Sequence, residues 1–170
     1  MIRTLVLIRH AKAEKSHPDG DHERELAERG VVDAKALGRW LAEEELTPDL
    51  VLVSTATRTR QTAEHVLEGA GADTEQWPGR GLYDGGPEGV LDAVREVPED
   101  AQVVWVVGHE PSTSLLTLSL ADEATSAAGA LEVVREHFAT STAAVLLLDG
   151  GWADLGEGGA RLAAVHTARA

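Results

Sequence analysis

The sequence predicts an α/β protein, a three-layer sandwich with a mostly parallel central sheet, helices on both faces and a short antiparallel edge. First, apolar runs rich in valine and leucine recur without strict polar alternation, as expected of strands buried on both faces. Second, segments of helical period separate the first three runs. Third, two apolar runs near the end of the chain flank glycine-rich turns, which is typical of an antiparallel hairpin at a sheet edge.

The predicted strands are short apolar runs bounded by polar residues or glycines. A run of about four to eight apolar residues between turn signals is consistent with a strand that is buried on both faces. Five such runs occur, the last of them weaker than the others: residues 5–8, 50–53, 103–107, 145–148 and 161–165.

The predicted helices lie between the strands. The clearest falls within residues 23–46, where apolar side chains recur every three or four positions and can share one face: Leu26, Val31, Ala34, Leu37, Trp40 and Leu41. Similar spacing predicts helices over 58–67, 89–97 and 112–120, with Pro111 suited to the first helical position. We interpret residues 69–81 as a loop.

Length and composition bound the class of protein. A chain of 170 residues fits a single domain, 1–170, that buries roughly 70% of its unfolded surface. Aspartate and glutamate number 29 against 15 lysine plus arginine, a net charge of -14, which argues against nucleic acid and membrane partners. The acidic exterior would favour a docking surface of basic character on a protein partner.

Cysteine is absent, so a thiolate nucleophile and a cysteine-ligated metal are excluded. The amino terminus shows no basic segment followed by a long apolar stretch and a cleavage site. No run approaches about 18 apolar residues. We therefore expect a cytoplasmic protein.

Chemistry-bearing residues follow the first three apolar runs. The first run ends in Arg9-His10, the second in Ser54-Thr55 with Arg58 in the next helical turn, and the third in Gly108-His109. In a parallel sheet these strand ends lie at one edge, so Arg9, His10, Arg58 and His109 could converge there. Two arginines and two helix amino termini facing one point favour a phosphate. The predicted ligand is a phosphoryl group.

The residue types suggest how such a group would react. A neutral imidazole is a nucleophile, and nearby arginines oppose its protonation. His10 is the better nucleophile candidate because it directly follows a strand and sits beside Arg9. Arg9, Arg58 and His109 would stabilise the charge on the transferring phosphoryl group. We expect a phosphohistidine intermediate and no requirement for a metal or other cofactor.

These motifs resemble a known family. Arg9-His10, "STATRTRQTAEHV" and "VVGHEP" resemble the histidine phosphatase superfamily, and the whole chain is similar to its small SixA-type branch of phosphohistidine phosphatases. The segments "LIRHAKAE", "DHERELAERG", "LYDGG" and "TSTAAVLLLDG" add to the similarity. The resemblance implies that His10 is the phospho-acceptor and that Arg9, Arg58 and His109 complete the phosphate pocket.

Two departures from the family pattern bear on the substrate. Ala11 stands where many members have glycine, which requires a backbone conformation open to alanine. Leu82-Tyr83 stands where the mutase and acid phosphatase branches have an acid, and Asp84 is only a neighbour. Protonating an alkoxide leaving group is worth about 10²–10⁴-fold, whereas phosphohistidine can leave as neutral imidazole. The missing acid favours phosphohistidine, and a phosphohistidine carrier protein is a candidate partner.

Alternatives remain open beside this interpretation. Arg24 in the "D-x-x-R-x-L" segment, Tyr83 and Ser141 are weaker candidates for substrate contacts, each with an ordinary structural role as the alternative. The segment "SHPDGDHE" could suggest a metal cluster, but its Pro and Gly mark a turn. The function could also be hydrolysis of small phosphorylated metabolites with Tyr83, Asp84 or Glu88 as acid, or phosphate binding without turnover.

Overall fold

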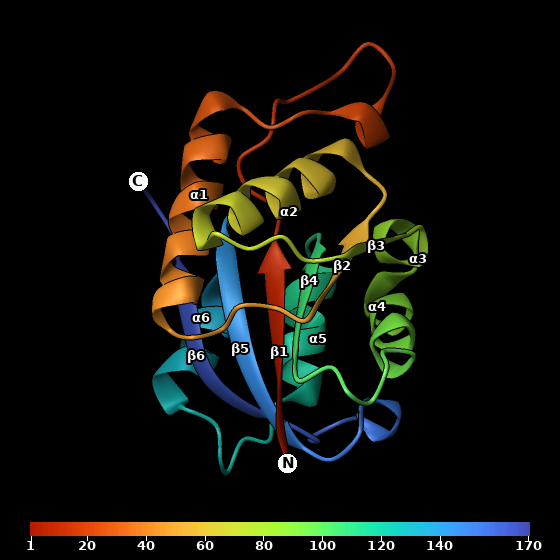
Figure 1. The fold of residues 1–170 in the computed structure, drawn as a ribbon, viewed down its shortest axis with the longest axis vertical. Helices are drawn as coiled ribbons and strands as arrows, with labels where there is room; N and C mark the ends of the chain where they lie inside the picture. The colour runs from red at the N-terminus through yellow and green to blue at the C-terminus, as the bar shows by residue number, and fades with distance from the viewer.

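The computed structural model describes residues 1–170 and contains one six-stranded sheet between two layers of helices (Figure 1). The strand order is β3-β2-β4-β1-β5-β6. The bounds are Ile2–Arg9 for β1, Leu50–Ser54 for β2, Gln76–Gly79 for β3, Val103–Gly108 for β4, Thr142–Asp149 for β5 and Arg161–Thr167 for β6.

Strand direction divides the sheet into two parts. β1 pairs in parallel with β4, β4 with β2, and β2 with β3. β5 runs antiparallel to β1, and β6 antiparallel to β5. The predicted α/β class, with a mostly parallel sheet and an antiparallel edge, is confirmed. The antiparallel strand β5 has 8 residues, as many as β1, and β6 has 7, so the antiparallel part is a substantial share of the sheet.

The helices cover both faces of the sheet. On one face lie α1 (Glu28–Glu43) and α2 (Thr57–Ala70), and on the other α4 (Gly86–Arg95), α5 (Ser112–Leu120) and α6 (Ala128–Glu136). Three shorter elements complete the chain: α3 (Gly81–Asp84) and the 3-10 turns η1 (Asp21–Glu23) and η2 (Trp152–Asp154). No helix combines the length and the apolar character needed to cross a membrane.

The interpretation of residues 69–81 as a loop is wrong. Helix α2 continues to Ala70 and ends at Gly71, whose left-handed φ of 67° suits glycine. The strand β3 then follows and pairs with β2. This strand carries no apolar run because it is an exposed edge strand, and Pro78 within it is tolerated only at such an edge.

Two helix boundaries also differ from the predictions. The helix expected over 89–97 begins earlier, at Gly86, with Pro87 in its first turn. Pro111 precedes α5, which begins at Ser112, and is therefore not itself the first helical residue. Helix α6 was not predicted.

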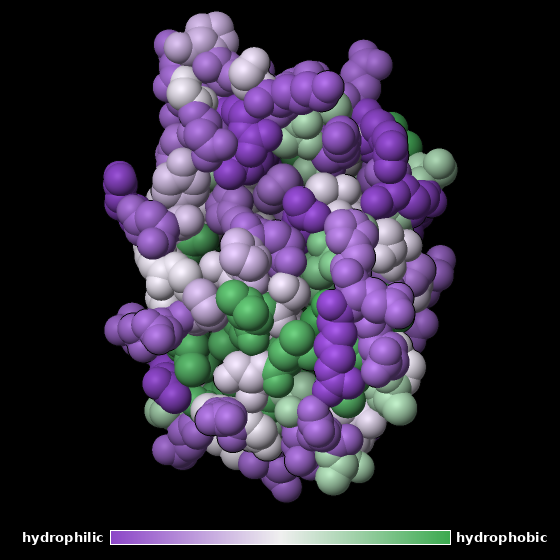
Figure 2. All heavy atoms as spheres, turned by 180° about the vertical axis from the view of Figure 1, so that it is seen from behind, coloured by the Kyte–Doolittle hydropathy of each residue, from purple (hydrophilic) through white to green (hydrophobic).

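Apolar side chains form a core on each side of the sheet. One cluster joins alternate residues of β1 and β4 to α4, α5 and α6, and the other joins the opposite faces of the same strands to α1 and α2. Figure 2 shows the molecule from behind, with apolar side chains gathered in the lower half and mainly hydrophilic ones at the top. The top is the end beyond the tip of β1 in Figure 1. A charged ligand is better matched to that end.

Candidate active site

The carboxyl ends of β1, β2 and β4 place the predicted residues at one edge of the sheet. Arg9 is paired with Gly108 across β1 and β4, and the His10 N–H donates to the Gly108 carbonyl oxygen over 3.0 Å. His10 and His109 therefore leave neighbouring strands side by side, with ring centroids 5.5 Å apart. Helices α2 and α5 begin just beyond this edge, so the positive ends of their dipoles lie near it. In α5 the Glu110 carboxylate accepts the Ser114 N–H over 2.7 Å and offsets part of this potential.

His10 is a buried, neutral imidazole. Its Nδ1 lies 2.8 Å from the carbonyl oxygen of Ala11, which only accepts, so Nδ1 carries the proton and Nε2 keeps its lone pair. Burial, more than the neighbouring Arg58 and Arg9, lowers the pKa of His10 to about 4. The ring is therefore held in its neutral form, with the Nε2 lone pair available.

Alanine fits the position that follows His10. Ala11 is fully buried and is not among the residues with positive φ. Its N–H donates to Oγ1 of Thr62 on α2 over 3.0 Å. The backbone here does not need glycine, so the departure from the family pattern leaves the His10 geometry intact.

His109 is fixed by hydrogen bonds at both ring nitrogens. Arg58 Nη2, which can only donate, lies 3.3 Å from Nδ1, so the proton is on Nε2, which donates to Oγ of Ser54 over 2.8 Å. Burial and the Arg58 guanidinium lower the pKa of His109 to about 3. His109 is thus a neutral donor whose orientation depends on Ser54 and Arg58.

Arg58 lies at the centre of the site and is already paired. Its side chain is buried, Nη1 donates to the backbone oxygen of Asp21 over 2.9 Å, and Nη2 lies 3.2 Å from Asp21 Oδ2. Its Nε has no hydrogen-bond partner. A buried guanidinium N–H is costly to leave unpaired, so Arg58 carries an unmet donor at the centre of the site.

Asp21 is a site residue that the sequence analysis missed. Besides Arg58, its carboxylate accepts hydrogen bonds from Arg24 Nε over 2.9 Å and from Tyr83 Oη over 2.8 Å. These donors, the Tyr83 hydroxyl first, lower the pKa of Asp21 to about 2. The segment "SHPDGDHE", in which the sequence predicts only a turn, therefore places a carboxylate against Arg24 and Arg58.

Arg9 and Arg24 lie within electrostatic reach of His10. Arg9 Nη1 donates to the carbonyl oxygen of Phe138 over 2.9 Å, and its Nε has no partner. Burial lowers the pKa of Arg9, while the Glu110 carboxylate opposes this shift. Arg24 is held by Asp21 and by the Glu14 carbonyl oxygen. Both guanidinium groups lower the pKa of His10, which places them within its electrostatic reach.

Tyr83 on α3 lies at the site, whereas the other two candidate acids face elsewhere. Its ring packs edge-on against His109 and His22, at centroid distances of 5.6 and 4.8 Å. Donation to Asp21 raises the pKa of Tyr83, which makes the hydroxyl a poorer acid. Asp84 is exposed and pairs with Arg80, and Glu88 is exposed on α4. No evident general acid stands beside His10.

Ser141 lies behind His10 and is fully buried. Its N–H donates to the His10 carbonyl oxygen over 3.2 Å, its φ is 54°, and its Oγ has no partner. The contact positions the His10 backbone from the residue that directly precedes the antiparallel strand β5. The structure thus gathers Arg9, His10, Arg24, Arg58, Tyr83 and His109, with Ser141 beneath them, and their catalytic roles stay predictions.

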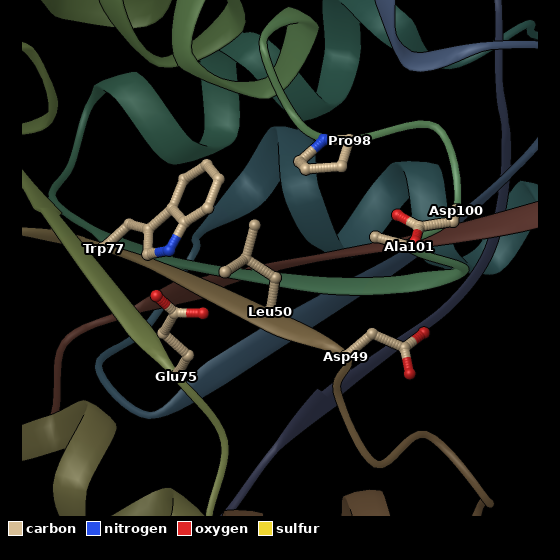
Figure 3. Close-up of a pocket in the computed structure, with 7 residues that line it drawn as sticks. All are labelled: Asp49, Leu50, Glu75, Trp77, Pro98, Asp100 and Ala101. Atoms are coloured by element: carbon tan, nitrogen blue, oxygen red, sulfur yellow. The ribbon is translucent and has the colours of Figure 1, made fainter.

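A hollow of about 280 Å³ lies at the opposite end of the strands from this site, near the beginnings of β2, β3 and β4 (Figure 3). It is lined by Asp49, Leu50, Glu75, Trp77, Pro98, Asp100 and Ala101, without a histidine or cation. Asp49 Oδ2 accepts the backbone N–H groups of Gln102 and Val103, a structural role. The three carboxylates do not converge in Figure 3, and no group of three or more metal-ligating side chains is formed.

Comparisons with known proteins show the family of this chain. The model of the histidine phosphatase superfamily (branch 1) matches residues 5–146. The uncharacterized protein Rv1276c of Mycobacterium tuberculosis (strain ATCC 25618 / H37Rv) is 40% identical over 164 residues, covering 95% of this chain and 100% of that protein.

Two solved structures share the fold. A candidate phosphohistidine phosphatase SixA from Nakamurella multipartitia is 39% identical, with a TM-score of 0.88 over 100% of this chain and 98% of the other. The protein histidine phosphatase SixA complexed with tungstate has a TM-score of 0.78 at 22% identity, over 96% of each chain.

The chain belongs to the histidine phosphatase superfamily. Within it, the fold and length are of the SixA type. Membership defines an enzyme of phosphoryl transfer, a phosphatase or a mutase. The resemblance stated from the motifs is thereby confirmed.

Proposed function

We propose that this protein is a phosphohistidine phosphatase, which transfers a phosphoryl group from phosphohistidine of a protein partner to His10 and then to water. The observation that carries the proposal is the tautomer of His10. The Ala11 carbonyl oxygen holds the proton on Nδ1, so Nε2 presents its lone pair among three guanidinium groups. A neutral nucleophile in a cationic pocket suits an anionic phosphorus centre.

The reaction has two balanced steps. Nε2 of His10 attacks phosphorus, the P–N bond of the substrate breaks, and the departing imidazole takes its proton from solvent. Water then attacks the phosphorus, the bond to Nε2 breaks, and inorganic phosphate leaves while the water proton returns to solvent. Arg58 and Arg9 would stabilise the charge on the phosphoryl oxygens in both steps. The His109 Nε2–H donates to Ser54 Oγ, so His109 would join them by exchanging that hydrogen bond for one to a phosphoryl oxygen.

The nature of the leaving group favours phosphohistidine over phosphate esters. An alkoxide needs a proton from a positioned acid. Asp84 and Glu88 are exposed, and Tyr83 donates its proton to Asp21, which raises its pKa. An imidazole can leave with a solvent proton, so the site lacks nothing that this substrate requires.

The test is covalent labelling together with turnover. Mixing the protein with a ³²P-phosphohistidine peptide should give acid-labile, base-stable label at His10 and release of phosphate. His10→Ala should lose label and turnover, whereas His65→Ala, a change on the α2 surface beside Glu68, should keep both. Phosphoserine peptide and sugar phosphates serve as competing substrates.

Each other outcome would assign a different function. Faster turnover of sugar phosphates than of the phosphohistidine peptide would make the protein a metabolite phosphatase. Phosphate or vanadate binding without label on His10 would make it a binding module. Turnover by His10→Ala would overturn the nucleophile itself.

A further inference from the structure

A polar hollow opens beside the candidate active site, within the long connection between β1 and α1. In Figure 1 this connection is the red-to-orange segment that rises beyond the tip of β1. The hollow has a volume of about 410 Å³ and is lined by Lys15, Ser16, His17, Gly20, Asp21 and Arg24, which we call the Lys15 pocket. Asp21 belongs to both sites, because its carboxylate contacts Arg58.

The Lys15 pocket holds donors without matching acceptors. Lys15 is exposed and has no ion pair, and Arg24 uses only Nε and Nη1, for Asp21 and Glu14, so Nη2 is unengaged. His17 accepts the Asp19 N–H at Nδ1, so its Nε2 is left as a donor, with the Asp19 carboxylate 3.8 Å from the ring.

The acceptor in the lining is already occupied. Asp21 receives hydrogen bonds from Tyr83, Arg24 and Arg58, which lower its pKa to about 2. No hydrophobic residue lines the Lys15 pocket, so it offers nothing to an aromatic base or an aliphatic side chain. In a chain of net charge -14, this lining carries one cation without an ion pair, Lys15, beside unengaged N–H donors of Arg24 and His17. Such a surface fits an anionic group.

We propose that the Lys15 pocket binds a second anionic group of the substrate, namely an acidic side chain next to the phosphohistidine of the protein partner. The proposal rests on the proposed function. Asp21 and Arg24 join the two sites, so an acidic residue can enter the Lys15 pocket while the phosphoryl group faces His10 and Arg58. The partner would then be acidic around its phosphohistidine, in contrast to the basic surface that the net charge alone would favour.

The test compares phosphohistidine peptides that differ only in their flanking residues. Peptides with aspartate or glutamate beside the phosphohistidine should have a kcat/KM roughly fivefold above that of matched asparagine and glutamine peptides, as expected of a partly exposed ion pair. Lys15→Gln should bring this ratio close to one. Lys35→Gln is the matched control, because Lys35 lies on α1 and pairs with Glu68. It should keep the ratio of the unmodified protein.

The outcomes separate this proposal from the proposed function. Hydrolysis of all peptides with equal kcat/KM, or a preference that survives Lys15→Gln, would overturn the Lys15 pocket and leave the phosphatase assignment intact. If no peptide is hydrolysed, sugar monophosphates and bisphosphates form a second arm. A Lys15-dependent preference for bisphosphates would overturn the acidic side chain as occupant, and no preference would overturn the anion subsite altogether.

Discussion

At the scale of single residues, the contact between Asp21 and Arg58 determines how many N–H groups of the Arg58 guanidinium are free to bind a phosphoryl group. Both Nη atoms of Arg58 lie within hydrogen-bond distance of Asp21 atoms, and Nη2 also contacts His109. A phosphoryl oxygen that binds Nη2 must compete with a carboxylate. Asp21 thus combines two effects: it orders Arg58, and it weakens the net gain from anion binding.

Asp21→Asn should therefore bind inorganic phosphate more tightly than the unmodified protein. An uncharged amide accepts a weaker hydrogen bond from Arg58, and the substitution removes a negative charge next to an anion. We expect the Kd for phosphate, measured by titration calorimetry, to fall about two- to fivefold, which is the scale of one partly exposed charge interaction.

Asp19→Asn provides the control, because it removes the same charge from the same turn without a contact to Arg58. It should change the Kd little. If Asp21→Asn instead weakens phosphate binding, then the main effect of Asp21 is to hold the Arg58 guanidinium in place, and its competition with phosphate for Arg58 is the smaller effect.

The residues at strand ends were accessible to sequence reasoning, whereas Asp21 was not. Arg9, His10 and His109 follow strongly apolar runs, so the period of the chain and the direction of the strands are enough to place them together. The place of Asp21 depends on how residues 11–27 fold back over Arg58, which no periodicity encodes. The available signal was its spacing to Arg24, three residues on, which matches their ion pair.

At the scale of secondary-structure elements, close contact between α1 and α2 determines where the second helix lies above the sheet. Gly38 of α1 faces the backbone of α2, so an added Cβ would overlap the Val66 carbonyl oxygen and lie 2.7 Å from the Ala70 nitrogen. Because backbone atoms cannot rotate away, any side chain at Gly38 must push the helices apart. Helix α2 carries Arg58, so this contact also bears on the site.

Gly38→Ala should reduce the free energy of unfolding by roughly 2 kcal/mol, since overpacking outweighs the better helix propensity of alanine. The measurement is urea denaturation at constant pH. Gly129→Ala in α6 is the matched control, because no atom lies within 4 Å of the added Cβ. It should raise stability by about 0.5 kcal/mol. A stable Gly38→Ala protein would show that α1 and α2 separate at little cost.

The elements that the sequence did not predict share a physical reason. Strand β3 lies at the exposed edge and pairs through its backbone, so its Gln-Trp-Pro-Gly residues need no apolar pattern. Helix α6 buries only Leu131 and Val134, which is too short a pattern to separate from a surface loop. Buried strands and long amphipathic helices leave a periodic signal, and elements held by backbone pairing or by one contact do not.

At the scale of the whole molecule, burial of two histidines couples the stability of the protein to pH. The pKa of His10 is lowered from 6.5 to about 4, and that of His109 from 6.5 to about 3, by burial first. Well above pH 6.5 neither ring is protonated in either state. Below pH 6.5, the two histidines bind protons in the unfolded chain but stay neutral in the folded protein. The free energy of unfolding therefore falls as the pH falls.

The pKa values define the pH range over which this stability is lost. It begins near pH 6.5 and continues to about pH 4 for His10 and about pH 3 for His109, and Asp21, lowered from 3.8 to about 2, adds to it at the acid end. Between pH 7 and pH 5, His10 alone should cost roughly 2 kcal/mol. Denaturant titrations at the two pH values measure the loss.

His10→Asn isolates the contribution of that ring, because asparagine does not titrate and only the difference between the two pH values is compared. The difference should shrink by roughly 2 kcal/mol in the variant, whatever the effect of the substitution on stability at pH 7. A direct NMR titration of the His10 ring should give a midpoint near 4. An unchanged difference together with a midpoint near 6.5 would mean that His10 is open to water, and a solvated, protonatable ring would remove the reason for its role as a neutral nucleophile.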